Sequence, residues 1–321
     1  MPPERYARQL VLPEIGAKGQ KKLAQAEVAI VGLGALGTVT AELLARAGIG
    51  RLILIDRDVV EESNLPRQFL YAEEDMGKSK ARAAEERLRK INSSITIEAE
   101  AVHLNTATSL ILKKADLIMD CTDNLATRFF LNDFCKKESK IWIYAAAVKT
   151  AGYVMPLFPG GPCLRCFLKE KADLETCASA GVLNTATSTI AGLQTTLALQ
   201  ILLNHNVSSK LYFLDIWQLD LKTLTIQQQK NCLACQGTYP ALEKKEEALL
   251  LRFCGEQKYQ LSGKKKDLAL IKRRWEKIGK VFFEKDALHR ENITLFADGR
   301  ALIKARSAEE AFALYDQYVG N

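Results

Sequence analysis

Two pairs of cysteines share the spacing C-x-x-C: CLRC at 163–166 and CLAC at 232–235, each flanked by glycine. Thiolate sulfur is a preferred zinc ligand, and four thiolates complete a tetrahedral shell. The pairs therefore predict a structural Zn²⁺ site that clamps two remote segments, with the ligands Cys163, Cys166, Cys232 and Cys235. One pair alone would also fit a redox dithiol, which stays an alternative. A closed shell of four thiolates leaves no position for a substrate on the metal.

A second spaced set is the glycine series in VGLGALG (31–37). Gly32, Gly34 and Gly37 fit G-x-G-x-x-G between a buried strand and a helix. This pattern allows a tight turn, close approach of backbone amides to a phosphate, and close packing of the helix on the strand. Asp56 ends the next strand, where such folds place a carboxylate on a ribose hydroxyl. By itself, this spacing fits an NAD(P)-dependent oxidoreductase.

Polar residues downstream of the glycines favour a different reaction. They are Asp58, Asn64, Arg67, Gln68, Lys80, Asp123, Asn124 and Arg128. Any one of them alone is best explained as an ordinary loop or helix-face residue. Together they supply cations, amides and a metal-binding carboxylate, more than a dinucleotide needs. Cleavage of a triphosphate requires cations and a divalent ion that stabilise the developing charge. We therefore expect an adenylating enzyme that uses ATP and Mg²⁺.

The chain resembles a known family, the ubiquitin-activating-like adenylyltransferases that activate sulfur carriers in thiamin and molybdopterin synthesis (the ThiF/MoeB/HesA group). The resemblance spans about 4–237. It rests on an ordered set of segments: RYARQ (5–9), VGLGALG (31–37), LIDRDVVEESNLPRQ (54–68), GKSKA (77–81), DCTDN (120–124), PCLRC (162–166), TCASAGVL (176–183) and CLAC (232–235). An ordered set of this kind is far more specific than the glycine series alone.

The resemblance implies roles for individual residues. Positions matching Asp56 bind the ATP ribose in that group, and those matching Asn64, Arg67 and Lys80 bind the phosphates. The position matching Asp123 organises Mg²⁺. The resemblance also implies that Arg8 reaches the nucleotide site of a partner subunit, so we expect a homodimer.

The implied partner is a small ubiquitin-like sulfur carrier whose C-terminal Gly-Gly attacks the α-phosphate of ATP, and a sulfurtransferase is a further expected partner. Cys177 matches a crossover-loop cysteine that bonds to the carrier in some members. After GVL (181–183) the segment 184–191 departs from the family pattern, which leaves the carrier's identity open. A peptide-modifying adenylyltransferase therefore stays an alternative. A non-catalytic partner protein is disfavoured, because none of the implied nucleotide-binding residues is missing.

Alternating strand and helix patterns must position these residues. They predict a doubly wound, mostly parallel α/β sheet through about residue 148, with an antiparallel extension at 151–158 and 211–228 and a helix at 185–204 between these segments. Ligands of such sheets bind at the carboxyl ends of the strands. The predicted helices before this point are 35–47, 78–91, near 105–114 and 124–138, and the predicted strands are 27–31, 51–56, 95–101, 115–120 and 141–147.

The last part of the chain predicts a separate domain. We place the boundary after residue 237, giving an ATP-binding domain at 1–237 and a small α+β domain of unknown role at 238–321. This tail predicts strand, helix, strand, a hairpin at 293–305 that turns at Asp298–Gly299, and a final helix at 307–318.

Composition excludes several protein classes. Of 321 residues, 48% are hydrophobic and 26% charged, as is usual for globular proteins. The net charge of +7 comes from scattered basic runs, so we expect no nucleic-acid partner. The N-terminus lacks the apolar core of a signal peptide, and no apolar run is long enough to cross a bilayer. We expect a cytoplasmic protein without disulfides.

Overall fold

The computed structural model describes residues 4–170, 180–243, 250–252, 258–284 and 287–320. The chain divides into two compact units, Met1–Lys244 and Lys245–Asn321. Each has its own hydrophobic core, so each is described separately. Among the described residues, no helix is long and apolar enough to cross a membrane.

The first unit contains an eight-stranded sheet in the order β3-β2-β1-β4-β5-β6-β7-β8. The five strands from β3 to β5 are parallel, and the remaining pairings are antiparallel. The parallel order reverses between β1 and β4, where open sheets of this kind bind ligands. The strands are β1 Glu27–Val31, β2 Arg51–Ile55, β3 Thr96–Glu100, β4 Leu117–Asp120, β5 Ile141–Val148, β6 Ala151–Leu157, β7 Lys210–Asp215 and β8 Asp220–Thr225. The predicted fold class is confirmed.

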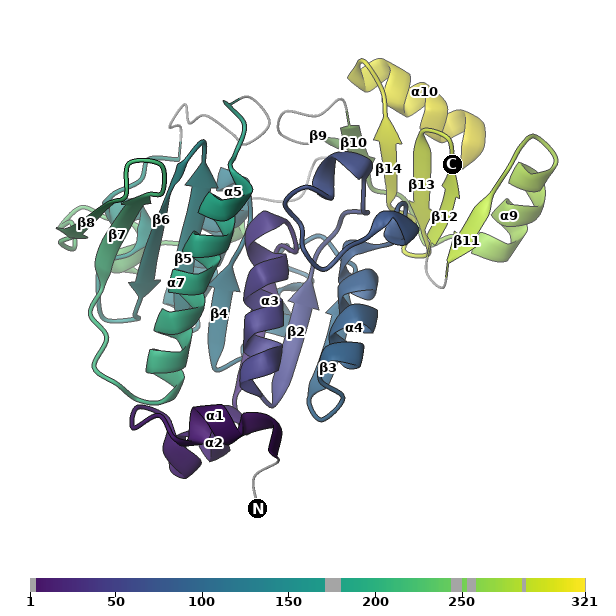
Figure 1. Ribbon diagram of the computed structural model, residues 1–321. Helices are drawn as coiled ribbons and strands as arrows, with labels where there is room; N and C mark the ends of the chain where they lie inside the picture. The colour runs from purple at the N-terminus through teal and green to yellow at the C-terminus, as the bar shows by residue number, and fades with distance from the viewer. Residues whose placement is uncertain (1–3, 171–179, 244–249, 253–257, 285–286, 321) are drawn as a thin grey trace. The chain divides into compact units, whose positions relative to one another are not determined.

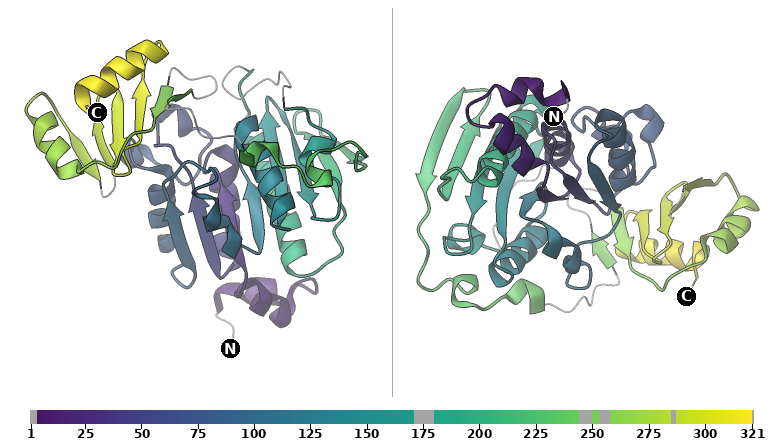
Figure 2. Two further views of the ribbon diagram at one scale, coloured as in Figure 1. Left: turned by 180° about the vertical axis from the view of Figure 1, so that it is seen from behind. Right: turned by 90° about the horizontal axis from the view of Figure 1, so that it is seen from below.

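Helices cover both faces of this sheet (Figures 1 and 2). Apolar residues of α3, α4 and α7 form one core with the sheet, and those of α5 form a second core on the opposite face. The parallel strands are buried on both sides, which explains their continuous apolar runs. The α-helices are α1 Ala7–Leu10, α2 Gly16–Leu23, α3 Ala35–Ala47, α4 Lys80–Ile91, α5 Leu125–Lys137, α7 Asn184–Leu202 and α8 Pro240–Glu243.

Short 3₁₀ helices occupy several connections. They are η1 Glu4–Tyr6, η2 Glu62–Asn64, η3 Glu73–Asp75, η4 Ser109–Lys114, η5 Leu164–Cys166 and η6 Ala234–Gln236. The α-helix expected near 105–114 is therefore wrong in type. Asn105 and Thr108 exchange side-chain bonds with each other's backbone N–H groups at 2.9 Å. This local turn competes with a regular helix start.

The second unit is a six-stranded antiparallel sheet in the order β11-β12-β13-β14-β10-β9. Its elements are β9 Leu250–Arg252, β10 Lys258–Leu261, α9 Leu268–Glu276, β11 Phe282–Glu284, β12 Ala287–Arg290, β13 Ile293–Phe296, β14 Ala301–Lys304 and α10 Ala308–Tyr318. The predicted hairpin is present, with Gly299 at φ +90° in its turn. The prediction missed β10 and β12, because each strand has only four residues, and β12 (ALHR) also lacks an alternation of apolar and polar residues.

Candidate nucleotide and metal sites

The glycine turn, residues 32–37, joins β1 to α3 at the carboxyl edge of the parallel strands. Gly32 has a φ of +89°, and a Cβ there would lie 2.7 Å from the Cys121 carbonyl oxygen. A Cβ at Gly37 would lie 1.9 Å from the Gly32 carbonyl oxygen. Both positions therefore require glycine. The N–H groups in the first turn of α3 have no partner within the helix and favour an anion.

Gly34 differs from the other two glycines, because no protein contact explains it. A Cβ there would meet only Gln68, with the amide nitrogen Nε2 3.8 Å away. Gln68 itself is buried, and its Oε1 has no hydrogen-bond partner among the described residues. The Gln68 oxygen is a buried acceptor without a partner, and it lies beside a glycine with free space around it. This arrangement fits a binding site in which a ligand supplies the missing hydrogen bond.

Two aspartates at the end of β2 connect the glycine turn to helix α4. The Asp56 carboxylate accepts the backbone N–H groups of Leu33 at 2.6 Å and Asp58 at 2.7 Å. Asp58 in turn forms an ion pair with Lys80, with 2.9 Å between Oδ2 and Nζ. The backbone N–H of Lys80 also donates to the Asp58 carbonyl oxygen at 2.9 Å. The structure thus brings three predicted residues together beside the glycine turn.

Lys80 remains charged although its side chain is only 8% exposed. Burial by itself lowers the pKa of this lysine, but Asp58, Asp56 and Asp123 outweigh that effect and raise the pKa above its ordinary value. The site therefore presents a fixed ammonium group near the glycine turn. A fixed cation can neutralise phosphate charge without the cost of reorganising water.

The loop that carries η2 holds the other predicted amide and arginine. Asn64 is buried, and its Oδ1 accepts the N–H of Glu61 at 3.2 Å. Arg67 donates to the carbonyl oxygen of Ser63 at 2.6 Å. These hydrogen bonds within the η2 turn therefore fix the side chains of Asn64 and Arg67. Gln68 follows Arg67 directly in the chain.

Residues after β4 divide into exposed and internal groups. Asp123 is exposed at the strand end, where it acts electrostatically on Lys80. Asn124 caps α5, because its Oδ1 accepts the N–H of Thr127 at 2.9 Å. Arg128 turns inward, lying 3.4 Å from Asp120 in an ion pair. These contacts give Asn124 and Arg128 partners within the protein, and their nucleotide contacts stay predictions.

Arg8 lies at the opposite end of the sheet from the glycine turn. Gln9, the next residue, donates to the Ala47 carbonyl oxygen at the C-terminal end of α3. The glycine turn precedes the N-terminal end of that 13-residue helix, about 20 Å away. Figure 1 shows α1 beyond the amino ends of the strands. Arg8 is exposed there and is remote from the nucleotide site of its own chain.

The cysteine cluster consists of Cys163, Cys166, Cys232 and Cys235, whose sulfurs all lie within 4.8 Å of one another. Three measured separations are 3.9, 3.4 and 3.7 Å. A tetrahedral zinc with bonds of about 2.3 Å would place its sulfurs about 3.8 Å apart. Both the donor set and the spacing therefore fit zinc. Burial raises the pKa of the Cys163 and Cys235 thiols, whereas at Cys166 burial is outweighed by hydrogen bonds from the backbone of Cys163 and Gln229, which lower the pKa.

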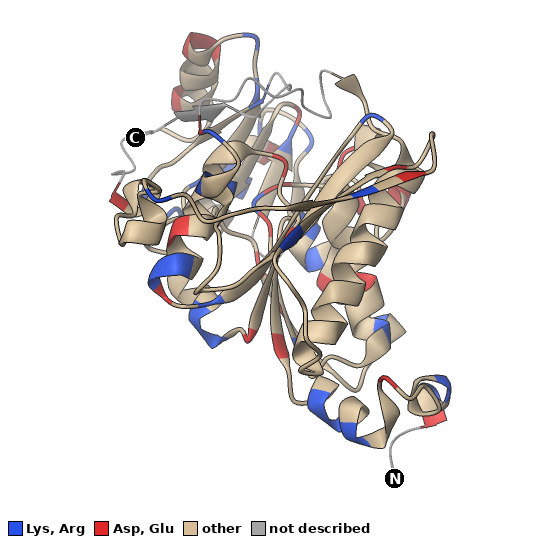
Figure 3. Ribbon diagram, turned by 90° about the vertical axis from the view of Figure 1, so that its left-hand side faces the viewer, with Lys and Arg blue, Asp and Glu red and all other residues tan. Residues whose placement is uncertain are grey.

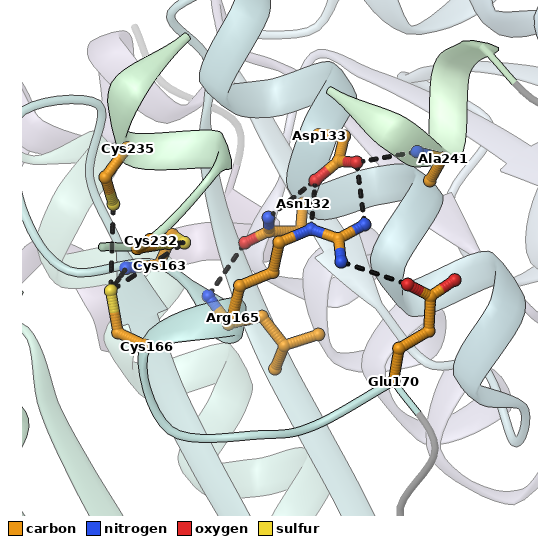
Figure 4. Close-up of polar contacts among 10 residues, drawn as sticks. Asn132, Asp133, Cys163, Arg165, Cys166, Glu170, Cys232, Cys235 and Ala241 are labelled. Carbon is orange, nitrogen blue, oxygen red and sulfur yellow. Dashed lines mark hydrogen bonds and ion pairs between the residues drawn. The ribbon is translucent and has the colours of Figure 1, made fainter. Parts of the chain in front are cut away.

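A buried polar network joins the cysteine cluster to α5 (Figure 4). Asp133 accepts both Nε and Nη2 of Arg165 at 2.8 Å and also the N–H of Ala241 at 2.9 Å. Asn132 accepts the N–H of Leu164 at 2.7 Å. Arg165 further contacts Glu170 at 3.1 Å. None of these polar residues was predicted from the sequence, although the position of Arg165 inside the first C-x-x-C pair is one signal that could have identified it.

Cys177, the predicted crossover cysteine, lies outside the described residues.

Basic and acidic residues are interspersed along the described part of the chain, as Figure 3 shows.

The fold and the sites together define an α/β protein of the nucleotide-binding type with a cluster of four cysteines whose donor set fits a metal ion. The ThiF family model matches residues 6–234, and the chain belongs to this family.

Similar proteins cover different shares of the chain. "Sulfur carrier protein ThiS adenylyltransferase" of Bacillus subtilis is 35% identical over 98% of this chain and 99% of its own length. "Sulfur carrier protein adenylyltransferase" of Thermus thermophilus is 34% identical over 78% of this chain and 96% of its own. "Adenylyltransferase and sulfurtransferase MOCS3" of Sus scrofa is 38% identical over 78% of this chain, which spans just 56% of that protein. The Bacillus subtilis relative thus matches the second unit as well.

Among solved structures, E. coli MccB with ATP has a TM-score of 0.64 at 25% identity, and the match covers 72% of this chain and 73% of the MccB chain. PaaA has a TM-score of 0.58 at 23% identity and covers 70% of this chain and 74% of its own, which shows the shared fold alone.

Proposed function

We propose that this chain is an adenylyltransferase that uses ATP to activate the C-terminal carboxylate of a small ubiquitin-like sulfur carrier. The observation that carries the proposal is the charged Asp58–Lys80 pair fixed beside a glycine turn that has an unfilled position at Gly34. The family and the relatives named as sulfur carrier adenylyltransferases support the same reaction and its use of ATP. They do not support hydride transfer, so the oxidoreductase alternative is set aside.

In the proposed step, a carboxylate oxygen of the carrier attacks the α-phosphorus of ATP. The bond from that phosphorus to the bridging oxygen breaks, and pyrophosphate leaves with its electron pair. The products are the carrier acyl-adenylate and pyrophosphate. The attacking carboxylate is already ionised, so no general base is needed. Catalysis then depends on positioning and on charge neutralisation by Lys80 and Arg67.

The remaining nucleotide contacts follow from the site. The amides at the start of α3 would hold phosphate oxygens, and Gln68 would donate or accept at the space beside Gly34. Asp56 keeps free lone pairs for a ribose hydroxyl while it holds the glycine turn. Asn64 would contact the phosphates from η2. Mg²⁺, when bound, would neutralise the triphosphate, and the exposed carboxylate of Asp123 is the residue that fits it.

The proposed experiment measures ATP–pyrophosphate exchange with purified carriers of the thiamin and molybdopterin types that end in Gly-Gly. Exchange should appear with a carrier and disappear when its terminal glycine is deleted. Absence of exchange with every carrier, from metal-loaded protein, would overturn the proposal. The likeness to MccB gives a second candidate, adenylation of a peptide. Exchange driven by a short peptide, but by no folded carrier, would favour that candidate.

A homodimer is a further part of the proposal, because Arg8 cannot serve its own chain's site. A groove of about 640 Å³ beside Gln9 supports a second copy as the partner surface. Its lining includes leucines of α3, α7, β7 and β8 together with threonines of α7, and two of these leucines, Leu43 and Leu221, are 38% and 61% exposed.

A complementation experiment tests the dimer directly. Arg8→Ala and Arg67→Ala should each abolish exchange. When the two variants are mixed and allowed to re-form dimers, about a quarter of wild-type activity should return, because half of the dimers are mixed and each has one complete site. If Arg8 acts within its own chain, the mixture will stay inactive.

The cysteine cluster completes the proposal as a structural zinc site. Transfer of sulfur to the activated carrier would follow adenylation, with a sulfurtransferase as donor, and Cys177 stays a predicted participant in that step. The cytoplasmic location and the separate role of residues 238–321 also stay predictions.

A further inference from the structure

Tyr71 lies in the loop between η2 and η3 and is buried, with 7% of its surface exposed. Its hydroxyl oxygen lies 3.0 Å from the carbonyl oxygen of Leu33 and 3.1 Å from that of Lys80. Both neighbours are acceptors, so the hydroxyl is the donor and its proton is shared between them. Burial, followed by the charges of nearby aspartates, raises the pKa of Tyr71 and keeps this proton in place.

The contacts of Tyr71 close a ring of hydrogen bonds. The N–H of Leu33 donates to Asp56, the N–H of Asp58 donates to the other oxygen of Asp56, and the ammonium of Lys80 donates to Asp58. Tyr71 connects the Lys80 backbone back to Leu33. The glycine turn and the phosphate-binding lysine therefore belong to one closed structure.

This ring of hydrogen bonds restricts the backbone of the glycine turn. Leu33 stands between two glycines, which allow many backbone conformations. Side chains now fix both of its polar backbone groups: Asp56 fixes the N–H, and Tyr71 fixes the carbonyl. The Tyr71 bond to Lys80 sets where α4 begins relative to the turn. A cation that stabilises a transition state must be held within a fraction of an ångström, because small misplacements cost rate.

We infer that Tyr71 is a positioning residue, which holds the Lys80 ammonium at a fixed place relative to the glycine turn during adenylation. The inference rests on the proposed function. Tyr71 acts through Lys80 and does not contact the substrate, since its hydroxyl donates to two protein carbonyl oxygens.

The experiment compares Tyr71→Phe with wild type in carrier-dependent pyrophosphate exchange. Phenylalanine keeps the buried ring and removes only the hydroxyl. We expect kcat to fall about tenfold or more, with KM for ATP changed less than about threefold, since a misplaced cation affects the transition state more than ground-state binding. Tyr315→Phe is the matched control, because Tyr315 also donates to a buried carbonyl, that of Gly299, but in the second unit. It should leave exchange unchanged.

A double-mutant cycle separates positioning from a general structural effect. In a Lys80→Ala background, Tyr71→Phe should cause no further loss, because the group it positions is absent. All variants are assayed at a temperature at which circular dichroism shows them folded. Equal kcat for Tyr71→Phe and wild type, or a full additional loss in the Lys80→Ala background, would overturn the inference. Absence of exchange in the wild type itself would instead overturn the proposed function.

Discussion

The glycine turn and the cysteine cluster both arise from short spaced patterns, but different forces hold them. Around the glycine turn, Asp56, Asp58, Tyr71 and Lys80 are already connected by protein hydrogen bonds. The cysteine cluster brings together four sulfurs from two segments whose paired members are 69 positions apart, and the mutual contacts of these sulfurs are only weak thiol interactions.

This difference indicates which of the two sites needs its ligand to keep its structure. A preorganised polar ring retains its shape before the nucleotide binds, which lowers the cost of the reaction. Four clustered thiols gain little from one another, and their thiolate forms repel. A bound metal would therefore stabilise the association of the two segments, as in other structural zinc sites.

The largest expected effect comes from removal of the metal. A strong chelator should lower the free energy of unfolding by about 5 kcal/mol or more, which corresponds to a fall in Tm of roughly 10–20 °C for a unit of this size. Removal of ATP should lower Tm only by the amount that corresponds to the free energy of ATP binding. Differential scanning calorimetry measures both shifts, with zinc content determined from the same samples.

Cys232→Ser and Cys135→Ala provide the matched comparison. Cys232 belongs to the cluster, whereas Cys135 is a buried thiol on α5 with a pKa raised by burial. Only Cys232→Ser should lose bound zinc. An unchanged Tm after complete removal of metal would show that protein contacts alone hold the cluster, and the contrast with the glycine turn would disappear.

Local patterns predicted most of the fold and the outlines of both sites. Gly32 and Gly37 were predictable because steric contacts within one β-α unit demand them. The cysteine pairs were predictable because each ligand pair sits in one turn. The alternation of strands and helices similarly predicted the parallel sheet, since both faces of its strands are apolar and the crossovers that follow β1, β2 and β4 each contain an α-helix.

The residues that the sequence did not reveal depend on tertiary contacts. Arg128 stays a predicted residue of the nucleotide site, but its bonds to the carbonyl oxygens of Thr122 and Ala145, on the buried side of α5, could not be read from the sequence. The role of Asp133 is visible only in the folded protein, where the turn that carries Arg165 packs beside it. Tyr71 lies in a loop without periodicity, and no spacing linked it to Leu33. In each case long-range packing, rather than local propensity, decides the role.

A smaller effect is expected at the network between the cysteine cluster and α5. Asp133→Asn keeps the side-chain shape but removes the charge that pairs with Arg165, whose side chain is 11% exposed. Glu170 still pairs with Arg165 at 3.1 Å, so weakening the two charge-assisted hydrogen bonds to Asp133 should cost about 2 kcal/mol. Urea unfolding measures the loss.

Glu42→Gln is the control for Asp133→Asn, because it breaks the exposed pair with Arg46 and should cost less than about 0.5 kcal/mol. Bound zinc should remain in both variants. Loss of zinc from Asp133→Asn would mean that the polar network, as well as the metal, holds the cluster together.

The smallest expected effect concerns Asn124, at the junction of the nucleotide site and α5. Its side chain caps the helix through the N–H of Thr127, so Asn124→Ala should destabilise the unit by about 1 kcal/mol. Asn124→Asp preserves the cap and should restore stability, because aspartate caps helices as well as asparagine does. If the cap is the whole role of Asn124, the aspartate variant will also retain pyrophosphate exchange. A variant of wild-type stability with exchange lost would return Asn124 to the nucleotide contacts, because the amide donor would then be needed where a carboxylate repels phosphate.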